Sequence, residues 1–325
     1  MLEVLCLDKL KNCVYQADIS RVPELVQDEN NILWIDIENP HNIWPDEQEL
    51  HLLTNVLNIH RLSVEDCISE RHYPKLENWE NYIFLIIYGL KFNNKLKLQD
   101  IELFLGNNFI VSYRHESIDD INTIKNDFKN RSNNHYSSSI DIFYTIVDRL
   151  VDGYIPIIDK FDIQIGKFEE ILFKNPFNNQ LINQLNTIRQ PMNMARQIIV
   201  LENEVFYNIV KNPYTLLPDD KKIYFRDIYD HLERYLTKIE NLKESISNLL
   251  EIQMNINTQN LNETIKFLTV ISTIFLPANV IAGIFGMNFV KLPFINSPYG
   301  HIFAFSLMIV FALTMILYFK KRKWL

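Results

Sequence analysis

Two apolar segments near the C-terminus constrain the fold of this chain more than any other feature of its sequence. They cover residues 267–285 and 302–319, and neither contains a charged side chain. A helix that crosses the hydrocarbon core of a bilayer needs about 17–25 predominantly apolar residues. The sequence therefore predicts a membrane domain over residues 267–325. Its expected parts are transmembrane helices at about 267–287 and 302–319, an outer loop at 288–301 and a basic cytoplasmic tail.

Charged residues beside these segments predict how the chain is oriented. Lys320, Lys321, Arg322 and Lys323 follow the second segment, whereas the connection between the segments carries one lysine, Lys291. Lysine and arginine concentrate in the cytoplasmic loops of membrane proteins. The N-terminal residues lack the basic and apolar regions of a secretory signal peptide. We expect a multi-pass protein of the cell (inner) membrane with both termini in the cytoplasm.

Composition limits the classes of partner. The formal net charge of −8 argues against nucleic acid, because binding to phosphates requires a basic surface. Cys6, Cys13 and Cys67 show neither a Cys-x-x-Cys spacing nor a zinc-type histidine cluster nearby. We expect reduced thiols in a cytoplasmic compartment. The lipid bilayer and further copies of the chain are the expected partners.

Residues 1–135 have the pattern of a cytoplasmic α/β domain. A helical pattern starts at Pro45-Asp46-Glu47, which places acidic residues in its first turn. Residues 101–105 and 109–113 flank Gly106-Asn107-Asn108 and are predicted to form a hairpin. Further strands are predicted at residues 2–7, 31–37 and 82–90. Strands that alternate with helices indicate a sheet covered by helices.

Residues 136–266 have the pattern of a cytoplasmic helical stalk. Helices are predicted over residues 137–174, with bends at Gly153 and Pro156, and over residues 178–211. Residues 219–276 contain neither proline nor glycine, so a helix over this stretch would be on the order of 85 Å long. This helix would begin in the stalk and continue into the first apolar segment. The soluble and membrane parts are therefore predicted to share one rod.

The long helix carries an apolar seam with the spacing of a coiled coil. Its residues follow one another at alternating intervals of four and three. They are Ile228, Leu232, Tyr235, Ile239, Leu242, Ile246 and Leu249. A helix with such a seam must pack on partner helices.

A second stripe runs along the first apolar segment and combines small or polar residues with two aliphatic ones. Its members recur at intervals of three and four residues: Asn262, Ile265, Thr269, Ser272, Leu276, Asn279, Gly283 and Gly286. Polar groups in hydrocarbon are costly unless they face protein or water. The stripe could form a dry helix–helix interface of small residues, or it could line a water-filled pore. The amide of Asn279 near mid-membrane favours the pore.

A pore of this kind requires several copies of the chain, because two helices cannot enclose one. Copies around an axis would present rings of amide, hydroxyl and carbonyl oxygens, separated by apolar rings at Ile265, Leu268 and Leu276. Apolar constrictions gate by dewetting. No acidic residue lies in this membrane segment. Since Mg²⁺ binds with several waters retained, a neutral asparagine ring suits a hydrated divalent ion.

Several motifs resemble one family. Gly286-Met287-Asn288, at the end of the first of two C-terminal membrane segments, resembles the signature of the CorA family of divalent-cation channels. Other similar stretches are Glu65-Asp66, Pro74-Lys75-Leu76-Glu77, Glu80-Asn81-Tyr82-Ile83-Phe84, residues 224–231 (YFRDIYDH) and the basic tail at 320–325. The resemblance covers essentially the whole chain. It implies a funnel-shaped homopentamer that passes Mg²⁺, and in many members Co²⁺ and Ni²⁺, into the cytoplasm.

The resemblance also implies roles for single residues. Gly286, Met287 and Asn288 would form the outer selectivity filter, with Asn288 bonding to the waters of a hydrated ion. Asn262 would form the inner polar ring, with Ile265 and Leu268 as the apolar gate. Asp227 would belong to an intracellular Mg²⁺-sensing interface, so that bound Mg²⁺ holds the channel closed. The resemblance names no partner for Asp227 on the neighbouring subunit.

Two departures from the family pattern leave Zn²⁺ as an alternative transported ion. Phe285 stands where a tyrosine is common, and the outer loop at 289–294 lacks the acidic residues of many members. An acidic ring would concentrate cations at the entrance. Relatives with acid-poor loops, the ZntB-like branch, move Zn²⁺, so a zinc transporter on the same scaffold, with or without proton coupling, is the alternative.

A third hypothesis is a membrane-anchored enzyme or adaptor without a pore. The soluble part contains no phosphate-binding glycine loop, no nucleophile elbow and no paired metal ligands of known motif. The histidines are scattered rather than clustered. We therefore expect no enzyme activity.

Overall fold

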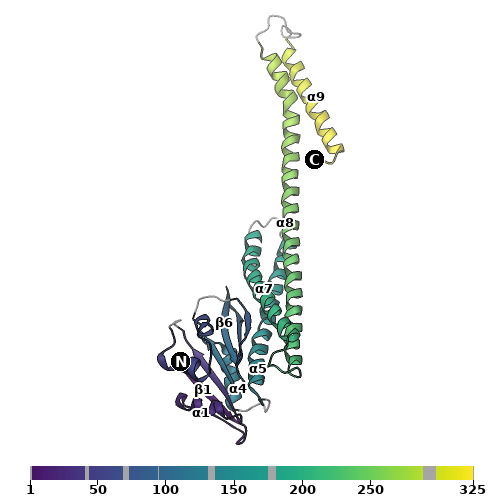
Figure 1. Ribbon diagram of the computed structural model, residues 1–325. Coiled ribbons are helices and arrows are strands. Elements are labelled where there is room, and N and C mark those ends of the chain that lie inside the picture. Colours follow the sequence, from purple (N-terminus) through teal and green to yellow (C-terminus); the bar gives the residue numbers. More distant parts are fainter. Residues whose placement is uncertain are drawn as a thin grey trace. The chain divides into compact units, whose positions relative to one another are not determined.

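The computed structural model describes residues 2–40, 44–68, 73–93, 95–130, 136–174, 181–287 and 298–324 (Figure 1). The chain divides into two compact units. The first unit comprises Met1–Glu170 and Gln180–Ser247, and the second comprises Ile171–Asn179 and Asn248–Leu325. The expected fold class is confirmed: an α/β domain is followed by long helices, of which the last two carry the apolar segments.

One mixed sheet of seven strands organises the described part of the α/β domain. The strands are β1 (Leu2–Asp8), β2 (Cys13–Gln16), β3 (Asn31–Glu38), β4 (Lys75–Asn78), β5 (Ile83–Asn93), β6 (Lys95–Leu105) and β7 (Phe109–Arg114). Their order is β2-β1-β3-β7-β6-β5-β4. β3 and β7 pair in parallel, and the other neighbours pair antiparallel.

Helices cover both faces of this sheet. On one face, β-strand residues share a hydrophobic core with α1 (Val22–Gln27), α2 (Glu47–His51), the π-helical turn η2 (Leu52–Val56) and α3 (Arg61–Asp66). On the other face lie α4 (Asp119–Asn130) and α5 (Ser139–Asp152). β3 is therefore buried along almost its whole length, which explains why its sequence is a continuous apolar run rather than an alternating one.

Most predicted strands are present, and the misses have physical reasons. The predicted hairpin is formed by β6 and β7, but β6 begins earlier than predicted, at Lys95. The prediction missed this first part because exposed lysines interrupt its apolar residues. The short strands β2 and β4 contain no buried residue and were not predicted. The prediction of a single helix over residues 137–174 is wrong. Gly153 caps α5, and a separate helix, α6 (Ile155–Lys174), begins with Pro156 in its first turn, where proline is tolerated.

The long helices agree with the sequence analysis. α7 spans Leu181–Lys211, α8 spans Lys222–Phe285 without interruption, and α9 spans Gly300–Lys321. The seven residues of the predicted apolar seam on α8 are all buried. The first part of α8 contacts α5 through Phe143 and Phe225 and contacts α7 through Tyr207 and Tyr229. The seam therefore finds packing partners within its own protomer.

A buried carboxyl group connects α7 to the sheet. Glu202 is 1% exposed, and its Oε1 accepts the backbone N–H of Tyr88 at 2.9 Å. The hydroxyl of Tyr154 lies 2.7 Å from Oε2 of Glu202 and also contacts the carbonyl oxygen of Tyr88. A single hydroxyl proton cannot serve both oxygens. When Glu202 is neutral, the acid donates to Tyr154 and Tyr154 donates to Tyr88, so every group is satisfied.

Burial raises the pKa of Glu202 to about 8, although its hydrogen bonds from Tyr154 and Tyr88 favour the charged form. The folded state therefore holds a proton that the unfolded state releases near its ordinary pKa. Folding stability from this group falls as pH rises from about 4.5 toward about 8.

We predict that Glu202→Gln removes this pH dependence. At pH 8 the unfolding free energy of the variant should exceed that of the wild type by on the order of a few kcal/mol. The reason is that the glutamine amide is neutral at every pH, whereas Glu202 must bind a proton to stay neutral when buried. Denaturation of the detergent-solubilised protein between pH 5 and 9 measures the difference. Glu204→Gln, at an exposed position of the same helix, is the control. Identical pH profiles for wild type and Glu202→Gln would contradict the assignment.

Candidate functional site

The second unit contains two helices that are long and apolar enough to cross a membrane. They are the C-terminal part of α8 and the whole of α9. In the most apolar stretch of each helix, only 11% of the residues are buried within the chain. The core helix of a soluble protein would bury its apolar side chains, so this exposure indicates helices that face lipid or other copies.

Burial along α8 shows which face contacts α9. Val270 and Ile281 are 2% and 8% exposed, and a further set on the same helical face is half-buried. That set comprises Ile274, Pro277, Ala278 and Phe285. On α9, Ala304 and Phe319 are buried, and Figure 1 shows α9 running back alongside the end of α8. We conclude that α9 covers the face that carries Val270 and Ile281.

The polar stripe lies on the opposite face. An α-helix turns by about 100° per residue, so the stripe positions are rotated by roughly 180° from the covered face. All eight are exposed in the protomer: Asn262, Ile265, Thr269, Ser272, Leu276, Asn279, Gly283 and Gly286. Leu268, beside them, is 63% exposed. Within the described residues, no part of the protomer covers this stripe.

The threonine hydroxyls on this part of α8 are satisfied inside the helix. The hydroxyl of Thr269 donates to the carbonyl of Ile265 at 2.7 Å, and the hydroxyl of Thr273 donates to the carbonyl of Thr269 at 2.7 Å. Each hydroxyl therefore loses no hydrogen bond when the helix enters a membrane. The oxygen of Thr269 keeps lone pairs that can accept a hydrogen bond from water.

The described part of the predicted filter is a tight turn after α8. The N–H of Gly286 donates to the carbonyl of Ala282 at 2.9 Å, and that of Met287 donates to the carbonyl of Ile284 at 3.3 Å. A Cβ at Gly286 would lie 3.1 Å from the carbonyl oxygen of Ala282, so a side chain would crowd the turn. Met287 is 50% exposed. Asn288 and the outer loop at 289–297 lie outside the described residues.

Asp227 lies in the first unit and has acidic neighbours that the sequence analysis missed. Its Oδ2 is 3.7 Å from Nε2 of His231, and Nδ1 of His231 is 3.5 Å from Oδ1 of Asp152. Burial and then the charges of Asp152 and Asp227 raise the pKa of Asp148. The acidic group thus combines residues of α5 and α8, and the i, i+4 spacing of Asp148 and Asp152 was its only local signal.

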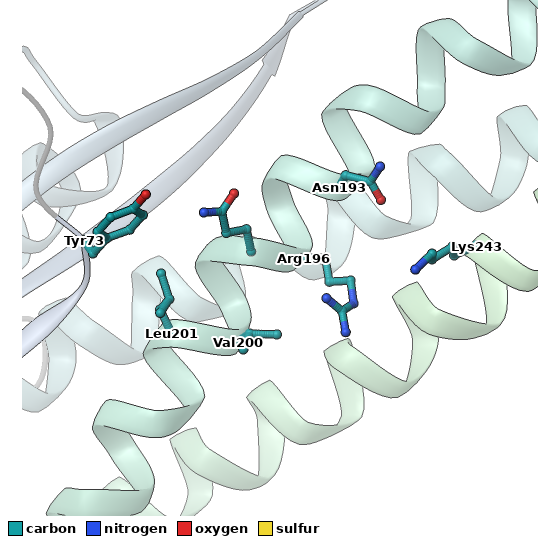
Figure 2. Close-up of a pocket in the computed structure, with 7 residues that line it drawn as sticks. Tyr73, Asn193, Arg196, Val200, Leu201 and Lys243 are labelled. Carbon is teal, nitrogen blue, oxygen red and sulfur yellow. The ribbon is translucent and has the colours of Figure 1, made fainter.

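A pocket of about 470 Å³ also lies in the first unit (Figure 2). Its walls include Arg196 of α7 and Lys243 of α8, which extend from facing helices. Arg196 donates to Glu240 at 2.9 Å. A pocket with two cationic side chains disfavours cations, so it is not a candidate for a cation site.

The chain is similar in sequence to membrane transporters. A model of the family described as CorA-like Mg²⁺ transporter protein matches residues 29–321. The cobalt/magnesium transport protein CorA of Thermotoga maritima is 27% identical over 303 residues, which cover 92% of this chain and 85% of that protein.

Solved structures share the fold at lower identity. The complete structure of the CorA magnesium transporter from Methanocaldococcus jannaschii matches with a TM-score of 0.82 and 18% identity, covering 99% of this chain and 98% of that chain. The ZntB cytoplasmic domain from Vibrio parahaemolyticus matches with a TM-score of 0.62 and 13% identity, covering 79% of this chain and 99% of that chain. These similarities establish the architecture.

The two faces of α8 should differ in access to water. In a variant without the native cysteines, we predict that a membrane-impermeant thiol reagent modifies Ser272→Cys and Asn279→Cys in vesicles. The matched controls Val270→Cys and Ile281→Cys should react at least about tenfold more slowly, because α9 covers them. Equal rates on both faces, or protection of positions 272 and 279, would contradict a wet stripe.

Proposed function

Because the chain belongs to the family of CorA-like Mg²⁺ transporter proteins, we propose that it conducts Mg²⁺ across the cell membrane into the cytoplasm as a homopentamer. It is a divalent-cation transporter of the membrane and not an enzyme. The proposed location is the inner membrane, with both termini in the cytoplasm. The observation that carries the proposal is the exposed polar stripe on the face of α8 that α9 does not cover.

The proposed pathway runs along the stripes of several copies of α8. Asn262, Thr269 and Asn279 supply oxygen atoms for the waters around an ion. Hydration waters are a better match than direct ligands, because residues 267–287 contain no carboxylate and Mg²⁺ releases water reluctantly. A membrane potential of 100 mV supplies about 4.6 kcal/mol for a divalent ion, twice the value for a single charge.

Apolar side chains between these oxygens form the proposed gate. Ile265, Leu268 and Leu276 are 52%, 63% and 66% exposed in the protomer, so each can project toward an axis. Rings of such residues close a pore by excluding water when its radius shrinks. Since the constriction needs no charge, it blocks all hydrated ions alike. Discrimination among ions is therefore assigned to the proposed filter at Gly286, Met287 and Asn288.

Flux measurements with purified protein in vesicles test the pathway. We predict that Asn279→Leu and Asn288→Ala each reduce Mg²⁺ uptake by about tenfold or more, which corresponds to a barrier higher by at least about 1.4 kcal/mol. Each change removes an amide that accepts hydrogen bonds from the waters around the ion. Ile309→Ala, at an exposed apolar position of α9, is the control and should retain the wild-type rate. Unchanged uptake in both asparagine variants, with assembly intact, would refute the pathway.

Zinc is the second candidate substrate. It is favoured by the absence of acidic residues in the outer loop at 289–294, since the entrance then lacks the charge that attracts strongly hydrated Mg²⁺. The name of the Thermotoga maritima relative instead supports Co²⁺ and Mg²⁺, and Ni²⁺ is a further candidate. Competition among Mg²⁺, Co²⁺, Ni²⁺ and Zn²⁺ in the same vesicles ranks these ions. Inhibition of Mg²⁺ uptake by Zn²⁺ at equal concentrations would favour the zinc assignment, and a pH gradient would reveal proton coupling.

Regulation by internal Mg²⁺ is proposed to use the acidic group around Asp227. Asp148, Asp152 and Asp227 place carboxylates of two helices near one another, and a divalent cation would relieve their repulsion. Such a ligand can favour the closed state only if it binds that state more tightly than the open one. Depletion of cytoplasmic Mg²⁺ would then release the gate.

We predict that Asp227→Ala raises the internal Mg²⁺ concentration for half-maximal inhibition by about tenfold, within the usual range of coupling energies. Patch recordings across a series of internal Mg²⁺ concentrations measure this shift. Asp230→Ala, exposed on the same helix, serves as the comparison and should not shift the curve. Identical curves for Asp227→Ala and wild type would remove Asp227 from the sensor.

A further inference from the structure

A second group of potential ligands lies in the sheet of the first unit, on β6 and at the end of β7. Asp100 and Glu102 are alternate residues of β6, so they share one face of the sheet. His115 directly follows β7, whose last pair with β6 joins Ile101 to Arg114. His115 therefore lies across from Asp100. Three side chains that are distant from the polar stripe in sequence come together here.

The distances suit one ion. One ligand atom from each residue can be chosen so that all three lie within 4.8 Å of one another, and Nε2 of His115 is 3.7 Å from Oδ2 of Asp100. Nitrogen and oxygen ligands at about 2.0–2.2 Å in a tetrahedral site lie roughly 3.5 Å apart. Small rotations of the side chains are enough to reach that spacing.

Buried polar atoms of this group lack hydrogen bonds within the part of the chain that the structure describes. Glu102 is 2% exposed, and its Oε2 has no hydrogen-bond partner within the described parts of the chain. Both ring nitrogens of His115 are buried and also lack a hydrogen bond to any described residue. Buried polar atoms are almost always paired. The two nitrogens of His115 lie on different edges of its ring, so Oε2 of Glu102 and one nitrogen of His115 are available to the same ligand.

Arg114, the cation beside His115 in the sequence, does not compensate these carboxylates. Arg114 precedes His115 and therefore points to the opposite face, where it binds Asp36 at 2.8 Å and Glu38 at 2.9 Å. Asp100 and Glu102 therefore share one face of the sheet without help from Arg114. A bound divalent cation would offset their charge.

We propose that Asp100, Glu102 and His115 bind one divalent transition-metal ion, such as Co²⁺ or Zn²⁺, within a single protomer. Imidazole with two carboxylates is a ligand set that these ions accept, whereas Mg²⁺ prefers oxygen ligands alone. Three protein ligands leave a further position for water. The site lies apart from the stripe and from Asp227 in sequence, and its existence does not depend on conduction.

Co²⁺ binding to the purified full-length protein in detergent tests the site. Equilibrium dialysis should show one more Co²⁺ per protomer in the wild type than in Glu102→Gln, Asp100→Asn or His115→Gln. The visible absorption of bound Co²⁺ should fall in the same variants. Glu116→Gln is the matched control, since it changes the next acidic residue, which pairs with Lys97 and Gln99 instead.

Thermal unfolding distinguishes loss of the ion from loss of the fold. Co²⁺ should raise the Tm of wild type and Glu116→Gln by more than that of Glu102→Gln, because an ion that binds the folded state stabilises it and this variant lacks one such site. In the presence of a chelator, Glu102→Gln should unfold at or above the wild-type temperature, because the variant has no buried carboxylate that needs a cation. Equal Co²⁺ stoichiometry and equal Tm shifts in all five proteins would overturn the proposal. A protein that binds this ion yet conducts none would refute the transport proposal alone.

Discussion

Hydrocarbon does not solvate polar groups, and this constraint determines what the second unit can be. α8 carries amides and hydroxyls at helical spacing on one face, while α9 covers another face with apolar contacts around Val270 and Ile281. The polar face is therefore uncovered in the protomer. In a membrane it must meet either water or a second copy of the chain. The proposed pathway follows from the first of these possibilities.

The features that sequence revealed are those with a local signal. Charge-free apolar runs, a long stretch without proline or glycine, and intervals of three and four residues predicted α8, α9 and the stripe. Strands β1, β3 and β5 were visible because their runs are apolar and bounded by turn residues. The boundary between α5 and α6 was misjudged, because glycine and proline signal both a bend and a complete break.

The acidic and metal-ligating groups needed the structure. Asp227 and Asp152 both contact His231 where α5 packs on α8, and Glu102 lies near His115 because of the strand register. Residues of different elements come together in both groups, and no sequence spacing links those elements. For Asn288 the opposite holds. Its assignment to the filter rests on sequence resemblance alone, because this residue lies outside the described residues. Family membership, by contrast, follows from a match over residues 29–321.

The most direct test is an experimental density map of the assembled protein in lipid, at a resolution that places side chains and ordered water. We predict that Asn279 of every copy faces a hydrated central opening while Ile281 of the same helix contacts α9. A map in which Asn279 is packed dry against a neighbouring copy, with no continuous opening along the axis, would contradict it.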